Sequence, residues 1–190
     1  MKLVKRGYFL KVLPRGAAVV LALLGGTWLM AQSLDSARIN DLLQQAKNRA
    51  VQANHDAELI ESYTRSQTSW HAHSLQLNSM KDHINNIGKT LSEMDAARAE
   101  GSAWQQEAIR DIEPLLRSMA DHMTTMITHL NEHQDQVHMP TYVDYTKANR
   151  ELSDKLLATL EDYVGYAQAK AKADDLEKKL DLPASTSGEQ

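Results

Sequence analysis

Cysteine is absent from the 190-residue chain, which excludes disulfides, thiolate metal sites, covalent c-type haem and a lipidated cysteine anchor. Aromatic residues are also scarce, at 5% with a single Phe, and there are only four prolines and eight glycines. A core must therefore be built from aliphatic side chains and Met. The most abundant residue types, among them Ala, Leu, Gln, Glu and Lys, are good helix formers. The length suits one domain of ordinary size.

Acidic residues are missing from the first 33 positions, and the first one is Asp35. Five basic residues lie early in this segment, and an apolar stretch follows at 16–31. That stretch, about 16 residues long, suits a signal-peptide core and is short for a membrane span of roughly 20. Ala31-Gln32-Ser33 fits a small-x-small cleavage site. We therefore expect residues 1–33 to be a signal peptide, with an uncleaved N-terminal membrane anchor as the alternative.

Either form of this leader predicts an exported, periplasmic chain, because the positive charge stays inside. The whole chain has 21 basic and 25 acidic residues, and the leader holds five of the basic ones. The remainder therefore has 16 basic against 25 acidic residues, a net charge of −9. Such an acidic domain is a poor partner for nucleic acid or anionic membranes. We expect membrane contact only through an uncleaved leader.

Residues 34–182 lack the period-two alternation of strands and have helical periodicity nearly throughout. Gly101 is a clear break, where we expect a left-handed residue to close a helix, and Ser102 with Gln105 predicts a capping box for the next one. Pro140 marks a second break, with Thr141 as the expected N-cap. The small, polar segment 183–190 is typical of a disordered tail.

Apolar residues recur three and four positions apart, which is typical of a left-handed helical bundle. This spacing predicts an all-α, up-down four-helix bundle with helices at 34–66, 69–99, 103–138 and 141–180. Its first turn rests on a slip of the repeat near 64–69; without that turn, one long N-terminal helix and two packed helices remain. In the last helix, the predicted seam is Tyr145, Ala148, Leu152, Leu156, Leu160, Tyr163, Ala167 and Ala171.

The chain has eight histidines, and two of them lie in matching Met-x-x-His pairs, Met80 with His83 and Met119 with His122. In a helical hairpin that turns at Gly101, these two pairs lie at the same height along the axis of the two antiparallel helices. Met80 is then expected to face His122, and His83 to face Met119. A set of two imidazoles and two thioethers suits copper or the axial positions of a haem iron.

Further histidines extend this hypothesis. The same hairpin brings His73 level with His129, and a first turn near residue 67 brings His55 level with Met80. His129 and His133, four residues apart, form another pair that can chelate one ion. A simpler interpretation makes the methionines ordinary core residues and the flanking histidines partly exposed surface groups.

No nucleophile motif, phosphate-binding loop or paired carboxylates stand out, so the sequence does not indicate an enzyme. The interpretation that we favour is a non-enzymatic interaction or structural module of the cell envelope without a cofactor. Its expected partner is a second copy or another envelope protein, docked on the small-residue face Ala46, Ala50, Ala53 and Ala57. The alternative is a periplasmic bundle that binds copper or haem b through the His/Met set.

Overall fold

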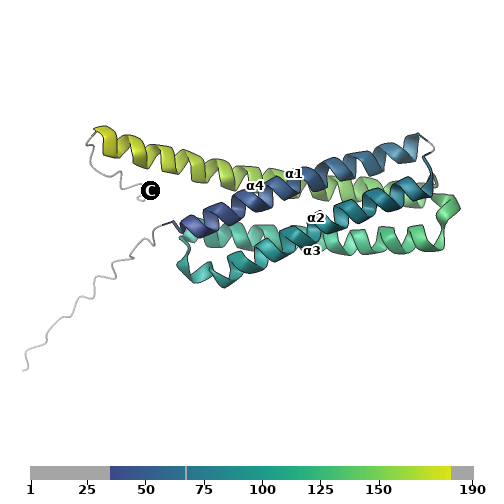
Figure 1. Cartoon of the computed structure of the whole chain (residues 1–190), viewed down its shortest axis with the longest axis horizontal. Helices are drawn as coiled ribbons and strands as arrows, with labels where there is room; N and C mark the ends of the chain where they lie inside the picture. Colours follow the sequence, from purple (N-terminus) through teal and green to yellow (C-terminus); the bar gives the residue numbers. More distant parts are fainter. Residues whose placement is uncertain (1–34, 67, 181–190) are drawn as a thin grey trace, which may run out of the picture. The chain divides into compact units, whose positions relative to one another are not determined.

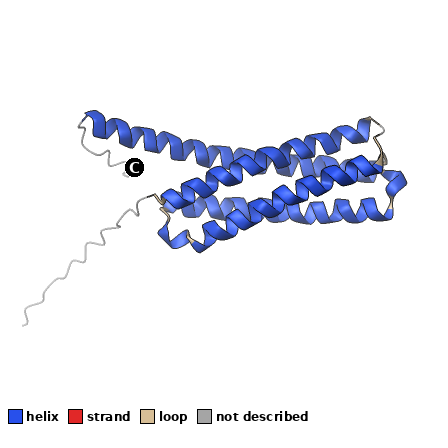
Figure 2. Ribbon diagram, in the orientation of Figure 1, coloured by secondary structure: helices blue, strands red, loops and turns tan. Residues whose placement is uncertain are grey.

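The computed structural model describes residues 35–66 and 68–180, and helices account for 92% of them, with no strand in these ranges. Within these ranges, four α-helices follow one another (Figures 1 and 2). They are α1 (Ala37–Arg65), α2 (Trp70–Ala96), α3 (Ala103–Glu132) and α4 (Pro140–Leu180), with short 3-10 turns η1 (Arg98–Glu100) and η2 (Gln134–Gln136). The predicted all-α four-helix bundle is confirmed, and the alternative with a single helix over 34–99 is wrong.

Each helix packs against two neighbours: α1 and α3 both contact α2 and α4. The apolar repeats of the first three helices lie in the shared core, as their spacing of three and four predicted. In α2 the buried positions run from His73 through Leu77, Met80, Ile84, Ile87 and Leu91 to Met94. In α3 they run from Ile109 to Leu130 with the same spacing of three and four.

The small-residue stripe of α1 lies inside this core. Ala46, Ala50, Ala53 and Ala57 are at most 1% exposed, since α1 packs closely on both α2 and α4. The expectation that this face docks a partner is therefore wrong. Its small side chains allow close packing within the chain and leave no surface for a second protein.

The buried face of α4 differs from the predicted seam. Thr146, Asn149 and Ser153 are buried, whereas Ala148 and Leu152 lie at the flank. The Thr146 hydroxyl donates to the Val143 carbonyl within its own helix at 2.8 Å. The Asn149 amide reaches the Met80 sulfur at 3.2 Å. These bonds help Thr146 and Asn149 to occupy the core, and a pattern that counts only apolar residues misses all three positions.

The turn between α2 and α3 is close-packed. Gly101 has extended backbone, with φ −86° and ψ 150°, so the predicted left-handed conformation is wrong. Glycine is needed there for space, because a Cβ would lie 2.7 Å from Cδ1 of the buried Ile39. The predicted capping box of Ser102 and Gln105 is confirmed. The Gln105 amide also donates to the Ser36 carbonyl at 2.9 Å, which joins this turn to the start of α1.

Helix α3 ends at Glu132, six residues before the predicted end, and η2 follows it. Helix α4 begins at Pro140, where proline suits the first helical position because its missing N–H has no partner to lose. In the described ranges, none of the helices has the length and apolarity that a membrane crossing requires. The predicted leader at 1–33 and the predicted tail at 183–190 lie outside the described residues.

Candidate functional site

Histidine and tyrosine side chains gather at the end of the bundle where α1 turns into α2 and α3 turns into α4. Tyr142, the third residue of α4, is fully buried at the centre of this group. Its ring makes an edge contact with His73 of α2 at 5.3 Å and stacks on His129 of α3 at 5.6 Å between ring centroids. We call the set the Tyr142 cluster; its members are Tyr63, His73, His129, His133, His138, Tyr142 and Tyr145.

His73 forms the inner side of the Tyr142 cluster. Its Nδ1 lies 3.3 Å from the Tyr142 hydroxyl, and its ring meets Tyr63 of α1 edge-on at 5.5 Å. Burial, with a smaller contribution from His138, lowers the pKa of His73 to about 4. Burial also raises the pKa of Tyr142. Both groups are therefore uncharged at neutral pH, as a buried pair with one hydrogen bond requires.

The outer side of the cluster faces solvent. The rings of His129 and His133 lie 4.9 Å apart at the end of α3, and Tyr145 meets His129 edge-on at 5.6 Å. Burial, followed by the nearby His133, lowers the pKa of His129. A surface groove of about 410 Å³ opens beside these rings; it is lined by Thr124, Thr125, Thr128, His129, Glu132, His133 and Tyr145.

The residues of the predicted His/Met set point in different directions. Met80 and Met119 are fully buried, and the Met80 sulfur accepts from Asn149 of α4. His83 turns toward α1, where its Nε2 lies 3.6 Å from Asp56 Oδ2. His122 is half-buried on α3. Equal height on two antiparallel helices does not determine rotation about the helix axis, and here the rotation of α2 directs His83 to α1.

The remaining predicted residues have separate environments. His73 and His129 do approach the same place, as their heights predicted, but Tyr142 lies between them and contacts both. His55 is exposed on α1, with its Nδ1 3.9 Å from Glu58 of the same helix. Among the described residues, no group of three or more His, Asp or Glu is arranged to hold a metal ion.

Asp56 is a buried acid that the sequence analysis missed. It is 6% exposed, accepts a hydrogen bond from Gln76 of α2 through Oδ1, and approaches His83 through Oδ2. The sequence signal for its burial was its position directly before Ala57, the last residue of the small-residue stripe. Asp56 therefore ties α1 to α2 through two polar side chains, and this explains the orientation of His83.

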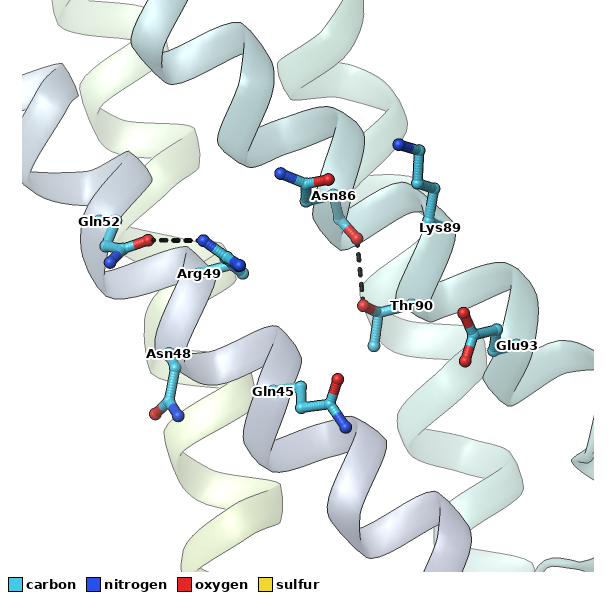
Figure 3. Close-up of a pocket in the computed structure, with 8 residues that line it drawn as sticks. All are labelled: Gln45, Asn48, Arg49, Gln52, Asn86, Lys89, Thr90 and Glu93. Atoms are coloured by element: carbon cyan, nitrogen blue, oxygen red, sulfur yellow. Dashed lines mark hydrogen bonds between the residues drawn. The ribbon is translucent and has the colours of Figure 1, made fainter.

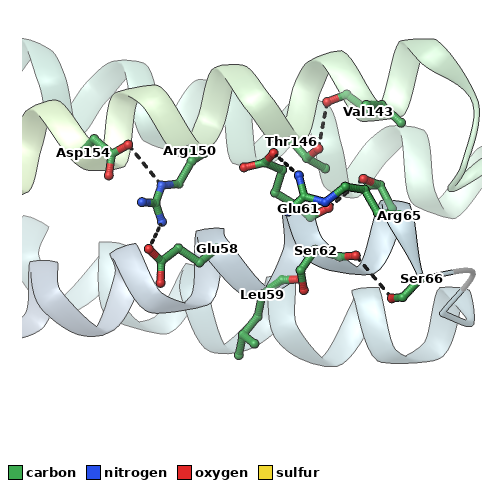
Figure 4. A network of polar contacts seen from close by, with 11 residues as sticks. Glu58, Leu59, Glu61, Ser62, Arg65, Ser66, Val143, Thr146, Arg150 and Asp154 are labelled. Carbon is green, nitrogen blue, oxygen red and sulfur yellow. Dashed lines mark hydrogen bonds and ion pairs between the residues drawn. The ribbon is translucent and has the colours of Figure 1, made fainter.

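Polar contacts also join α1 to α4 along the outside of the bundle (Figure 4). Arg150 of α4 pairs with Glu58 of α1 at 2.7 Å and with Asp154 of its own helix at 3.1 Å. Asn54 of α1 donates to Asp154 at 2.8 Å. The guanidinium has five donors in a fixed plane, so one Arg150 side chain serves both helices. This arrangement is suited to alignment of the two helices.

A second surface groove, of about 500 Å³, lies between α1 and α2 (Figure 3). Its walls are polar, and its lining residues are Gln45, Asn48, Arg49, Gln52, Asn86, Lys89, Thr90 and Glu93. The two hydrogen bonds drawn in Figure 3, from Arg49 to Gln52 and from Thr90 to the Asn86 carbonyl, each stay within one helix. The groove is thus a polar surface feature rich in side-chain amides.

The chain was compared with known proteins at the level of families, curated sequences and solved structures. No family model matches it, and no curated protein or solved structure is significantly similar to it.

Proposed function

We propose that this chain is a non-enzymatic structural module of the cell envelope, which associates with a second copy of itself through the projecting part of α4. The observation that carries the proposal is an apolar stripe exposed on that part of the helix. The basic leader followed by an apolar segment supports the location. The lack of recognisable catalytic motifs in the sequence supports a role without chemistry.

Helix α4 is longer than its partners, with 41 residues against 27 to 30 in the other three. Its last buried residue is Val164, and beyond it the helix extends past the start of α1 (Figure 1). Leu176 is 45% exposed and Leu180 64% exposed. Tyr166 still meets Trp104 edge-on and Lys170 still pairs with Asp35 at 2.8 Å, so the projecting part of α4 is 171–180. A helical segment without tertiary packing gains little stability alone, so a second helix is the natural complement.

The exposed stripe has coiled-coil spacing. Five positions follow the alternating interval of three and four, namely Tyr166, Ala169, Ala173, Leu176 and Leu180. Residues at this spacing pack against a partner helix as the a and d positions of heptads. We assign Tyr166, Ala173 and Leu180 to a positions, and Ala169 and Leu176 to d positions.

The charges beside the stripe favour a parallel pair of identical helices. Lys172 takes a g position and Glu177 the e position of the following heptad, and such g and e residues face each other across a parallel dimer. Opposite charges then meet twice, once on each side. An antiparallel pair brings Lys172 opposite Lys179, which sets like charges together, and Lys170 opposite Glu177, which offsets this repulsion. Among the described residues, the parallel pair has only the attractive contacts. The sequence of this segment is therefore complementary to a second copy in parallel register.

The cysteine-free chain allows a direct test by disulfide trapping. In a parallel dimer, Leu180→Cys places two sulfurs opposite each other, and mild oxidation yields a covalent dimer. In the antiparallel register residue 180 lies opposite residue 169, so the two 180 positions are about 16 Å apart at 1.5 Å per residue. A disulfide needs Cα atoms within about 7 Å. In a mixture of Ala169→Cys and Leu180→Cys chains, the mixed disulfide between residues 169 and 180 therefore forms only in the antiparallel register, whereas the parallel register gives only like-with-like disulfides, and mass spectrometry distinguishes the two products.

Matched control variants distinguish association through this stripe from nonspecific association through other exposed apolar residues. Leu75 is 74% exposed on α2, away from the stripe, so Leu75→Cys is expected to remain monomeric under the same oxidation. Light scattering of the full chain is expected to show dimers that Leu176→Glu converts to monomers, while Leu75→Glu leaves them unchanged. A wild-type chain that stays monomeric at high micromolar concentration contradicts the proposal.

A further inference from the structure

His129 lies on the last turn of α3, and His133 is the C-cap residue that follows the helix. Residues four apart on a helix are neighbours on one face, and the two ring centroids are 4.9 Å apart. Two imidazoles that bind one ion through bonds of about 2.0–2.1 Å hold their ring centroids about 4.5 to 5 Å apart. The observed spacing therefore suits chelation without movement of the backbone.

The position of the pair also favours a cation. The C-terminal end of an α-helix carries the negative end of the helix dipole, which attracts positive charge over the last turn. His133 is the residue that ends the helix, and its backbone N–H donates to the His129 carbonyl at 2.8 Å. This bond holds the two residues in register.

The surroundings restrain the His129 ring, which borders an open groove. The ring is stacked on the buried Tyr142 and met edge-on by Tyr145, so its orientation is determined by packing before any ligand arrives. Its Nε2 is buried and has no hydrogen-bond partner. The adjoining groove, with Thr128, Glu132 and Tyr145 in its walls, gives access to water, which can complete a coordination shell.

From this geometry we infer that His129 and His133 chelate one divalent first-row transition-metal ion, of the Zn²⁺ or Cu²⁺ class, in the groove between α3 and α4. Imidazole suits these ions, whereas Mg²⁺ and Ca²⁺ require oxygen ligands. Because the described residues hold no group of three His, Asp or Glu at a metal-binding spacing, the ion has two protein ligands, and water fills the other positions. The site differs from the His83/His122 set and does not depend on self-association.

Calorimetric titration of the full, untagged chain with Zn²⁺ and with Cu²⁺ tests the inference. We expect one ion per chain in the wild type and at least a tenfold loss of affinity in His133→Ala, which removes a partly exposed ring at the helix end. His55→Ala is the matched control, because His55 is an exposed histidine of α1. The affinity of this variant for the metal ion is expected to equal that of the wild type. Electron paramagnetic resonance of the Cu²⁺ form is expected to show coupling to two imidazole nitrogens.

Two results overturn the inference. One is equal affinity in the wild type and His133→Ala, with circular dichroism showing that both are folded. The other is a loss of binding in the His83→Ala, His122→Ala double variant, which places the ion at the other set. Light scattering on the same samples reports self-association separately, so failure of the metal site and failure of the proposed dimer are distinguishable.

Discussion

At the scale of single residues, Gly101, in the turn before α3, and Gly165, inside α4, have different roles. A Cβ at 101 meets the buried Ile39 side chain, whereas nothing lies within 4 Å of a Cβ at 165. We expect Gly101→Ala to lower the free energy of unfolding by about 1–3 kcal/mol through overpacking. Gly165→Ala, in the interior of α4, is expected to raise it by about 0.5–1 kcal/mol. Urea denaturation of both variants measures these opposite shifts.

The cause of the Gly101 effect can be checked with a second substitution. Ile39→Val removes the Cδ1 atom that the new Cβ would meet, at a cost of about 0.5–1.5 kcal/mol by itself. In the Ile39→Val background, Gly101→Ala is therefore expected to cost less than in the wild type. An equal cost in both backgrounds means that the destabilisation has another origin.

His73 predicts how stability depends on pH. Its pKa is lowered from 6.5 to about 4 by burial beside Tyr63 and Tyr142, with a smaller electrostatic contribution from His138. Between these values the unfolded chain binds a proton that the folded chain excludes. Stability is therefore fully present above pH 6.5 and is lost as the pH falls toward 4. One such group accounts for about 3 kcal/mol over this window.

The variant His73→Phe retains a ring and removes this titration. We expect its free energy of unfolding to fall less between pH 7 and pH 4 than that of the wild type, by urea denaturation at each pH. Its stability at pH 7 is a separate quantity and does not affect the comparison of slopes. His71→Ala, which removes an exposed histidine, is the control, and its free energy of unfolding is expected to change with pH as in the wild type. Identical slopes in wild type and His73→Phe count against a buried, neutral His73.

At the scale of elements, the alanine stripe sets the distance between α1 and its neighbours. Ala53 is fully buried, so Ala53→Leu adds volume to a core without space for it. We expect a loss of about 1–3 kcal/mol in the free energy of unfolding. Val51, about half exposed on the same helix, gives the matched control, and Val51→Leu is expected to have little effect. If Ala53→Leu leaves the free energy of unfolding unchanged, the stripe is not tightly packed in the core, and it becomes a candidate docking face again.

At the scale of the whole molecule, the chemical contrast between the leader and the bundle predicts export with cleavage. Mass spectrometry of the protein from its native cells is expected to find an N-terminus near Gln32 or Leu34. Ala31→Arg places a large charged residue at the small-residue position and is expected to retain the leader. A wild-type chain recovered from membranes with Met1 intact indicates an anchor instead.

The apolar spacing of α1, α2 and α3 was readable from the sequence because every third or fourth residue on those faces is apolar, and each helix buries one such face. The turn near residue 67 followed from a slip in that spacing. The buried face of α4 was not readable, since Thr146 and Asn149 are polar and are accommodated only by bonds to Val143 and Met80. The left-handed Gly101 was wrong for a similar reason, because the constraint comes from Ile39, 62 positions earlier.

The sequence by itself determined the helices, their order and the height of each side chain along the bundle, because these depend on local periodicity and on the positions of the turns. Only the tertiary structure decided which histidines meet. The rotation of each helix about its axis is set by the packing of all its neighbours, and local spacing does not contain it. That rotation directs His83 to Asp56, places Tyr142 between His73 and His129, and so gathers the cluster at one end of the bundle.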